Sequence, residues 1–305
     1  MVDYHEPVLL KESIDFLLTD RNGTYIDATF GGGGHSREIL SRLGPNGKVL
    51  AFDVDDSSRQ IGEKLASEDR RFRFVNENFA RLRSVAEETV TNSPCGFLFD
   101  LGVSSNQIDN ETGFSYRRDE RLDMRLDKRL AISAYEVVNS YEPEALADVF
   151  WKYGEEPRSR ALARLIVKQR ENGNIETTSQ LAEVIQRIFG KSIKALSRIF
   201  QAIRIEVNKE LESLSEGLDA AVDLARRGGR IVVISYHSLE DRIVKEKFKY
   251  EASTCVCPPQ AIICTCGKVA RIKIITRKAV VPDELEVNRN RRARSAKLRV
   301  AEKII

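Results

Sequence analysis

A glycine-rich segment stands near the start of the chain and reads Asp27-Ala28-Thr29-Phe30-Gly31-Gly32-Gly33-Gly34-His35-Ser36. It follows a short β-like run, Thr24-Tyr25-Ile26, and opens a helical pattern that contains Ile39 and Leu40. Four consecutive glycines bury no side chain. They allow the chain to turn sharply out of a strand and let its backbone approach a ligand closely. The segment therefore predicts a strand, a ligand-binding loop and a helix, in preference to a flexible surface loop.

The next apolar run, Lys48-Val49-Leu50-Ala51-Phe52, ends in Asp53, nineteen residues after Gly34. An acid at the tip of the second strand of a Rossmann-like sheet is placed to accept hydrogen bonds from ribose hydroxyls. Ser36 occupies the position of the third glycine of a dinucleotide fingerprint, and the chain has no G-x-x-x-x-G-K-[ST] segment. An adenosine ligand without a pyrophosphate fits this loop better, so we expect S-adenosylmethionine as the cofactor.

Asp100 ends another apolar run, so acids stand at the ends of three expected strands. Ligands of open α/β folds bind at the carboxyl ends of the strands. We therefore expect an α/β fold, a Rossmann-like class I methyltransferase sheet. Asp27 would lie near the methionine end of the cofactor, Asp53 at its ribose, and Asp100 where the methyl group meets its acceptor. The expected later strands are Arg73–Val75, Gly96–Phe99, Arg230–Ser235, Arg271–Arg277 and Leu298–Ala301.

Helical patterns replace strands between the fourth and fifth strands. A run with apolar residues three or four apart extends from Leu196 to Leu218 and predicts one long helix. Earlier patterns predict helices over 143–153, 155–170 and 181–189, the last preceded by a capping box at Thr177-Thr178-Ser179-Gln180. We expect residues 1–108 and 198–305 to form the two parts of the methyltransferase domain, and 109–197 an all-helical insertion that recognises substrate.

Length and composition indicate a globular protein. The chain has 305 residues, of which 42% are hydrophobic, so one large domain or two domains are expected. No apolar run approaches the ~20 residues of a membrane span. The first residues lack a basic region before an apolar run, so we expect no signal peptide and a cytoplasmic protein without a membrane partner.

The net charge of +3 is unevenly distributed. Between Arg242 and Arg299 there are fifteen Lys and Arg against five Asp and Glu, which gives this part +10 and the remainder −7. Arginine suits bidentate phosphate contacts, so the basic C-terminal segment predicts RNA binding. The alternative is a solvated charge cluster, or arginines held against the domain by the last strand. The predicted RNA-binding residues are Arg289, Arg291, Arg292 and Arg294.

The five cysteines include one close group, Cys255, Cys257, Cys264 and Cys266, while Cys95 stands alone. Four thiolates suit zinc, but this C-x-C-x6-C-x-C spacing is tighter than the common C-x2-C pairs. Disulfides are disfavoured in a reducing cytosol. We assign no metal ligand from the sequence and leave open the choice between zinc and a loop of free thiols.

Motifs along almost the whole chain identify a family. The two most specific are Asp100-Leu101-Gly102-Val103-Ser104-Ser105 and His237-Ser238-Leu239-Glu240-Asp241-Arg242. Leu122-Asp123-Met124-Arg125, Tyr153-Gly154-Glu155-Glu156 and the terminal Arg292–Arg299 accompany them. By these motifs and the glycine segment, the chain resembles the MraW family of ribosomal RNA methyltransferases.

The resemblance implies methyl transfer from S-adenosylmethionine to the exocyclic N4 of a cytidine in the decoding region of small-subunit (16S) ribosomal RNA. The partner would be that RNA or the assembled small subunit. Asn106 departs from the family, which often has Pro before the following Gln. The cofactor contacts implied by the resemblance are Gly33, Gly34 and His35 for the methionine portion, Asp53 for the ribose, Phe79 for the adenine, and Asp100 and Gln107 for the rest.

The acceptor amine of cytosine is a poor nucleophile because its lone pair is conjugated into the ring. A paired base must also leave its helix to reach a pocket. Orientation therefore carries most of the catalysis, without a metal or a covalent intermediate. Asp100 is the candidate catalytic residue, to orient either the amine or the ammonium of the cofactor. His237 and Ser238 could face the same pocket, and a structural role for His237 is an equal alternative.

Two other functions stay open from the sequence alone. A DNA amino-methyltransferase would carry a Pro-Pro-aromatic segment after the fourth strand, which this chain lacks after Asp100. A non-catalytic RNA- or ribosome-binding factor would tend to lose the glycine loop, Asp53 and Asp100. The oligomeric state, with a homodimer as one option, is not determined by the sequence.

Overall fold

The structure is a computed structural model that describes residues 7–102, 112–258, 260–261 and 263–305. It divides into two compact units, Met1–Gly102 with Leu211–Ile305, and Val103–Glu210. The helical unit thus extends beyond the predicted 109–197 and includes residues 198–210.

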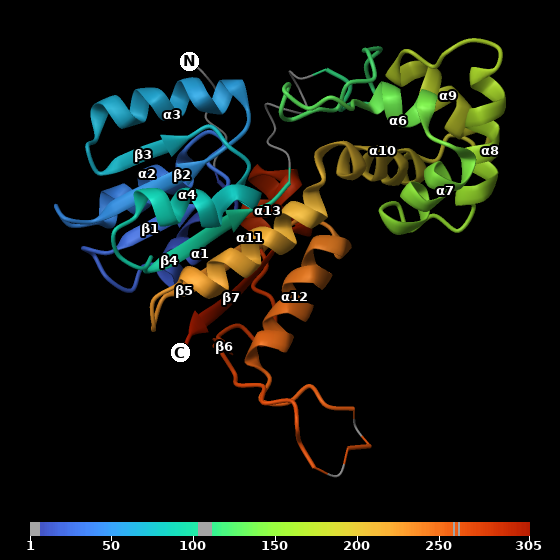
Figure 1. Cartoon of the computed structure of the whole chain (residues 1–305). Helices are drawn as coiled ribbons and strands as arrows, with labels where there is room; N and C mark the ends of the chain where they lie inside the picture. The colour runs from blue at the N-terminus through green and yellow to red at the C-terminus, as the bar shows by residue number, and fades with distance from the viewer. Residues whose placement is uncertain (1–6, 103–111, 259, 262) are drawn as a thin grey trace. The chain divides into compact units, whose positions relative to one another are not determined.

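The first unit is built on a seven-stranded sheet in the order β3-β2-β1-β4-β5-β7-β6 (Figure 1). The strands β1 to β5 are parallel, and β7 runs antiparallel to both β5 and β6. All the strands expected from the sequence are present, which confirms the α/β fold. Their bounds are β1 Thr24–Asp27, β2 Lys48–Phe52, β3 Phe72–Val75, β4 Gly96–Asp100, β5 Arg230–Ser235, β6 Ile272–Ile274 and β7 Lys297–Lys303.

In the central strands, successive apolar side chains are buried on opposite faces of the sheet. In β4, Leu98 packs in the core on one face, and Phe97 and Phe99 pack in the core on the other. Burial of each such side chain stabilises the folded state by about 1.5–3 kcal/mol. The first core includes residues of α1 (Leu10–Leu17), α2 (Gly34–Arg42) and α3 (Asp56–Glu68). The second includes residues of α4 (Leu82–Thr89), α11 (Glu210–Leu224) and α12 (Ser238–Ala252).

The strand order reverses between β1 and β4, and this point positions the site. Asp27 pairs in register with Leu98, so the carboxyl ends of β1 and β4 lie together. Asp100 pairs with Ile234, which brings the residues after β5 to the same edge. Ligands of open α/β sheets bind in the crevice at such a switch point.

The second unit has a helical core of its own. The predicted helices and the capping box of Thr177 and Gln180 are confirmed. Among the described residues of this unit, the only β-type pairing is an isolated bridge between Arg121 and Thr177. Across the described chain, no helix has the length and apolarity needed to cross a membrane. The helices are α6 Ala134–Ser140, α7 Pro143–Lys152, α8 Ser159–Arg170, α9 Thr178–Phe189 and α10 Ile193–Asn208.

The predicted single helix from Leu196 to Leu218 is wrong, because it is two helices. Lys209, between α10 and α11, has φ 50° and ψ 40°, a left-handed conformation that no helix continues through. The buried Asn208 side chain accepts the N–H of Leu126 at 2.8 Å and donates to the carbonyl of Met124 at 2.7 Å. These tertiary bonds end the helix, although the apolar spacing continues across the break.

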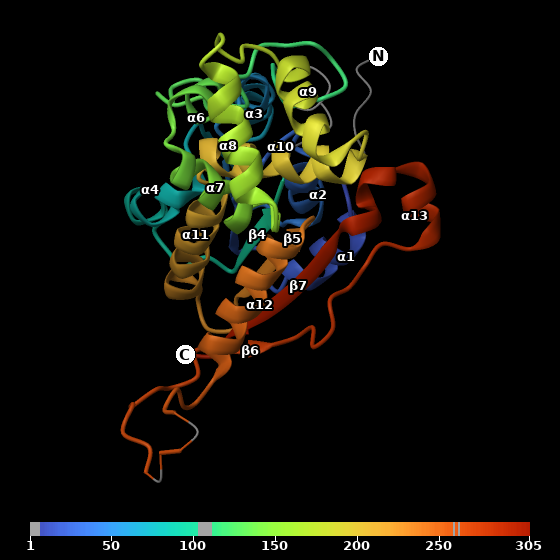
Figure 2. The same ribbon diagram turned by 90° about the vertical axis from the view of Figure 1, so that its right-hand side faces the viewer.

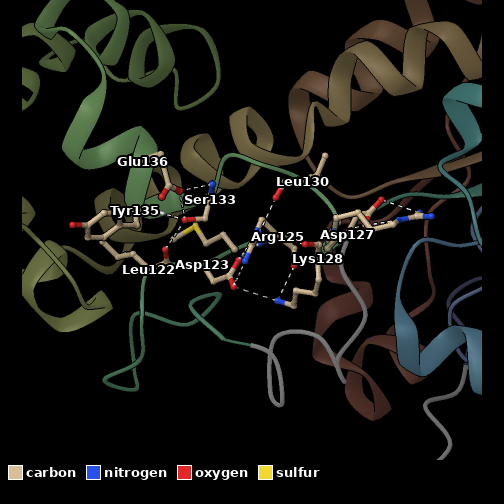
Figure 3. A network of polar contacts seen from close by, with 12 residues as sticks. Leu122, Asp123, Arg125, Asp127, Lys128, Leu130, Ser133, Tyr135 and Glu136 are labelled. Atoms are coloured by element: carbon tan, nitrogen blue, oxygen red, sulfur yellow. Dashed lines mark hydrogen bonds and ion pairs between the residues drawn. The ribbon is translucent and has the colours of Figure 1, made fainter.

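Polar contacts order the segment around Asp123 in the same unit (Figure 3). The Arg125 guanidinium donates to both carboxylate oxygens of Asp123 at 2.7 and 3.1 Å and to the carbonyl of Leu130 at 2.8 Å. Met124 is fully buried with φ 58°. Surrounding contacts must hold a non-glycine residue in this conformation, which otherwise costs about 1–3 kcal/mol. The segment that carries the family motif is therefore an ordered loop.

Candidate active site

Two of the four glycines are required by close packing. Gly33 precedes α2 with φ 79°, and a Cβ there would lie 2.7 Å from the ring of Phe30. A Cβ on Gly34 would lie 2.2 Å from Cγ of Pro7. A Cβ on Gly32 would meet nothing within 4 Å. The loop therefore packs tightly at its helical end and has an open side at Gly32.

The two kinds of glycine should respond differently to alanine. Gly34→Ala should lower the free energy of unfolding by about 1–3 kcal/mol, because its Cβ overlaps Pro7. Gly32→Ala, the matched control, should change it by less than about 0.5 kcal/mol. Urea denaturation of the cofactor-free protein measures both. If Gly34→Ala unfolds at the wild-type urea concentration, the packing argument is wrong.

Asp27 ties the end of β1 to the start of α2. Its side chain is fully buried and accepts hydrogen bonds from the hydroxyl of Ser36 at 2.6 Å and from the N–H of Thr29 at 3.2 Å. Burial raises the pKa of Asp27 to about 6. Both carboxylate oxygens thus fix the conformation of the glycine loop.

Asp53 joins β2 to the same loop. One carboxylate oxygen accepts the N–H of Gly31 at 2.7 Å, and the other accepts the N–H of Asp55 at 3.0 Å. Burial raises the pKa of Asp53. The side-chain amide of Asn76 donates to the carbonyl of Asp53 at 3.0 Å. A carboxylate offers about four lone-pair positions, so Asp53 can still accept from ribose hydroxyls.

Asp100, the last residue of β4, has polar neighbours from three other parts of the chain. Its N–H donates to the hydroxyl of Thr29 at 2.6 Å, and the hydroxyl of Tyr236 donates to its carboxylate at 2.8 Å. Nδ1 of His35 lies 3.6 Å from the other carboxylate oxygen. Burial lowers the pKa of His35 to about 4, so this imidazole is neutral near pH 7.

The electrostatics of the site favour a cationic ligand. Among the described residues, Asp27, Asp53 and Asp100 form no ion pair with Lys or Arg. Burial raises the pKa of Asp100 to about 7, the bond from Tyr236 opposes this rise, and the negative charge of Asp27 adds to it. Buried carboxylates need compensating charge or hydrogen bonds.

The residues present fit S-adenosylmethionine, which carries a sulfonium and an ammonium. Three carboxylates without a cationic partner suit its positive charge. Within the described chain, Nε2 of His35 is buried and has no hydrogen-bond partner, so it can bond to a ligand. The open side at Gly32 allows close approach to the backbone.

Phe79 begins a 3-10 helix, Phe79–Arg81, that follows β3. Its half-buried ring meets Phe99 edge to face with centroids 5.7 Å apart. A Cβ on Gly217 of α11 would lie 2.8 Å from this ring, so the absence of a side chain there makes room for Phe79. The geometry is compatible with the predicted adenine contact.

His237 caps α12. Its Nδ1 accepts the N–H of Glu240 at 3.4 Å, and the buried Glu240 carboxylate accepts the N–H groups of Tyr236 and His237 at 2.8 and 3.2 Å. This reciprocal capping favours the structural alternative for His237. Ser238 is the first residue of the same helix. The predicted contact Gln107 lies outside the described residues.

The sequence interpretation did not assign three residues that contact the acids of the site: Thr29, Ser36 and Tyr236. Thr29 and Ser36 belong to the glycine-rich segment, where hydroxyls flanking Asp27 were the available signal. Tyr236 follows β5 directly. Its position after a strand that neighbours β4 was the signal that could have identified it.

The predicted RNA-binding arginines lie before β7, on α13 (Glu284–Arg289) and a 3-10 helix, Arg291–Ser295 (Figure 2). Arg289, Arg291 and Arg294 are exposed, whereas Arg292 is half-buried. Arg289 also lines a groove with residues of α1 and α2 that includes Glu12, Glu38, Asp283 and Glu286. These carboxylates would compete with phosphate for Arg289. Of the exposed arginines, Arg291 and Arg294 are therefore the better candidates for phosphate contacts.

Comparison with known proteins agrees with the geometry. The model of the MraW methylase family matches residues 3–304. Proteins named "Ribosomal RNA small subunit methyltransferase H" are 45% identical in Caldicellulosiruptor saccharolyticus, covering 98% of this chain and 99% of theirs, and 48% identical in Bacteroides fragilis, covering 98% and 97%. An rRNA methylase structure from Streptococcus thermophilus aligns with TM-score 0.42 and 11% identity over 97% of this chain and 94% of its own, too distant a likeness to inform function. The chain therefore belongs to the MraW methylase family, and the cofactor of its active site is S-adenosylmethionine.

Proposed function

We propose that this protein methylates the exocyclic N4 of a cytidine in the decoding region of small-subunit ribosomal RNA, in the cytoplasm. The names of its relatives support ribosomal RNA as the substrate. The observation that carries the chemistry is the Asp100 carboxylate, which accepts a hydrogen bond from the hydroxyl of Tyr236 at the switch point beside the glycine loop. The backbone N–H of Asp100 is held by the hydroxyl of Thr29.

The cofactor supplies an electrophilic methyl group on its sulfonium when it is bound. The chain supplies position: Gly33, Gly34 and His35 hold the methionine portion, Asp53 the ribose and Phe79 the adenine. Asp100 accepts a hydrogen bond from the amine of the cytosine and so turns its lone pair toward the methyl group. The hydroxyl of Tyr236 donates to the carboxylate of Asp100 and so orients it. Orientation of this kind is worth several kcal/mol of the barrier.

The helical unit, Val103–Glu210, is our candidate for recognition of the RNA substrate. The ordered loop around Asp123 gives this unit a fixed surface segment. The arginines before β7 are the candidate phosphate contacts on the sheet unit.

The salt dependence of RNA binding tests the arginine run. Replacing Arg289 and Arg291 with Ala should reduce the slope of log affinity against log salt by roughly one for each lost phosphate contact. A reduction near one would indicate that the carboxylates around Arg289 already neutralise it. The matched control is Arg70→Ala with Arg73→Ala, which removes two exposed arginines near β3, at the other edge of the sheet. Equal slopes for the wild type and the Arg289 and Arg291 variant would show a charge cluster without a role in RNA binding.

A transfer assay tests the substrate class. The wild-type chain is incubated with labelled cofactor and with small ribosomal subunits, free small-subunit RNA or DNA. Label in the ribosomal RNA supports the proposal, whether the subunit or the free RNA is the better substrate. Label in DNA alone would favour a DNA amino-methyltransferase, and no label in any arm would favour a non-catalytic binding factor.

A further inference from the structure

A loop joins α12 to β6 and projects beyond the end of that helix (Figures 1 and 2). It carries four of the five cysteines, Cys255, Cys257, Cys264 and Cys266. Among its described residues, three large apolar side chains are exposed: Ile263 to 75%, Val269 to 60% and Val256 to 46%. None of the described residues from Ser253 to Ala270 belongs to a hydrophobic core of the sheet unit. The loop therefore needs another source of order, and small segments without a core commonly use a metal or disulfides.

The four sulfurs of this cysteine cluster converge on one point. All lie within 4.8 Å of one another. The Cys264 sulfur is 3.4, 3.5 and 3.8 Å from those of Cys255, Cys266 and Cys257, and Cys266 is 3.9 Å from Cys255. A tetrahedron of sulfurs around zinc, with Zn–S bonds of about 2.3 Å, has edges of about 3.8 Å. The four separations, 3.4 to 3.9 Å, lie close to that edge.

Two backbone N–H groups of the loop also point to sulfurs of the cluster. The N–H of Val256 points to the sulfur of Cys266 at 3.4 Å, and the N–H of Cys257 to the sulfur of Cys255 at 3.4 Å. Outer hydrogen bonds of this kind orient metal ligands and stabilise their charged form. Gly267 has φ 60°, which permits the turn that returns the chain after the last cysteine.

We propose that Cys255, Cys257, Cys264 and Cys266 bind one Zn²⁺ ion that folds this loop. A metal held by four protein thiolates has no open position, so the site is structural and takes no part in methyl transfer. Zinc is preferred over ferrous iron because nitrogen, oxygen and sulfur sites bind it more strongly. This proposal is independent of the substrate assigned to the active site.

Metal analysis of the purified full-length chain tests the proposal. The wild type should contain about one zinc per chain, and Cys264→Ser should retain less than about a tenth of it. Thr265→Ala, a neighbouring exposed residue without a thiol, is the matched control and should keep the wild-type content. Iron in place of zinc, or metal-free protein with four reactive thiols or with disulfides, would overturn the assignment.

Reconstitution keeps the test independent of any folding defect in the variants. Wild-type protein stripped by a chelator should be cut faster by protease within residues 253–270 and regain resistance with Zn²⁺ but not Mg²⁺. Co²⁺ in place of zinc should give the absorption bands of tetrahedral thiolate coordination. Proteolysis that is identical with and without Zn²⁺ would contradict a loop folded by the metal.

Discussion

Asp100→Asn should reduce the single-turnover rate of methyl transfer by about 100-fold or more, while the protein stays folded. The substitution keeps the shape of the side chain and an oxygen for the hydroxyl of Tyr236, but removes the negative charge. Rapid-quench measurements with saturating cofactor and RNA give the rate, and calorimetry gives the cofactor affinity. Asp56→Asn, on the exposed first turn of α3, is the charge-matched control. A near wild-type rate at saturation with weakened cofactor binding would make Asp100 a cofactor residue only.

The pH dependence of the methyl-transfer rate provides a second test of the role of Asp100. Its pKa is raised by burial from 3.8 to about 7, so the fraction of enzyme with an ionised carboxylate grows as pH rises through 7. Transfer by the wild type under subsaturating conditions should rise over the same range, and Asp100→Asn should lack that step. A wild-type profile that is flat between pH 6 and 8 would contradict a required carboxylate.

Stability should show the opposite trend. A carboxyl whose pKa is raised by folding stabilises the protein fully below its unfolded pKa, and this contribution is lost as pH rises through about 7. The free energy of unfolding of the cofactor-free wild type, measured relative to that of Asp100→Asn, should therefore fall as pH rises from about 4 to 7. Thermal melts near pH 4 and at pH 8 measure the difference. A variant that is less stable than the wild type at pH 8 would indicate a structural role for the charge.

Asp53→Ala should weaken the binding of S-adenosylmethionine by roughly 10- to 150-fold, on the order of 1.5–3 kcal/mol. The substitution removes charge-assisted acceptors for the ribose hydroxyls and frees the N–H of Gly31. Titration calorimetry measures the affinity, with Asp56→Ala as the control for loss of one nearby exposed acid. Affinity within twofold of the wild type would show that Asp53 only organises the loop.

The sheet could be predicted because its signals are local. Each strand is a short apolar run, and the alternation of Leu98 with Phe97 and Phe99 matches the two faces they pack against. The glycine segment and Asp53 are also local, and the structure joins them through the bond from Gly31. Capping by Thr177 and Gln180 follows from a four-residue pattern.

What the sequence did not predict depends on distant partners. The break at Lys209 follows from bonds of Asn208 to Met124 and Leu126, more than eighty residues away, while the apolar period runs on unbroken. The bond from Tyr236 to Asp100 depends on the pairing of β5 with β4; the position after the fifth strand pointed to the pocket but not to this bond. The convergence of four thiols is likewise a property of the folded loop, since the C-x-C spacing alone left zinc and free thiols open.

Nucleoside analysis of the methylated RNA tests the central claim most directly. Small-subunit RNA is methylated by the wild-type chain with labelled cofactor, digested to nucleosides and separated against methylcytidine standards, and fragments are mapped before digestion. We predict label in N4-methylcytidine, from one cytidine in the decoding region, and its loss with Asp100→Asn. Label in another methylated nucleoside, or in N4-methylcytidine spread over many positions, would contradict the account.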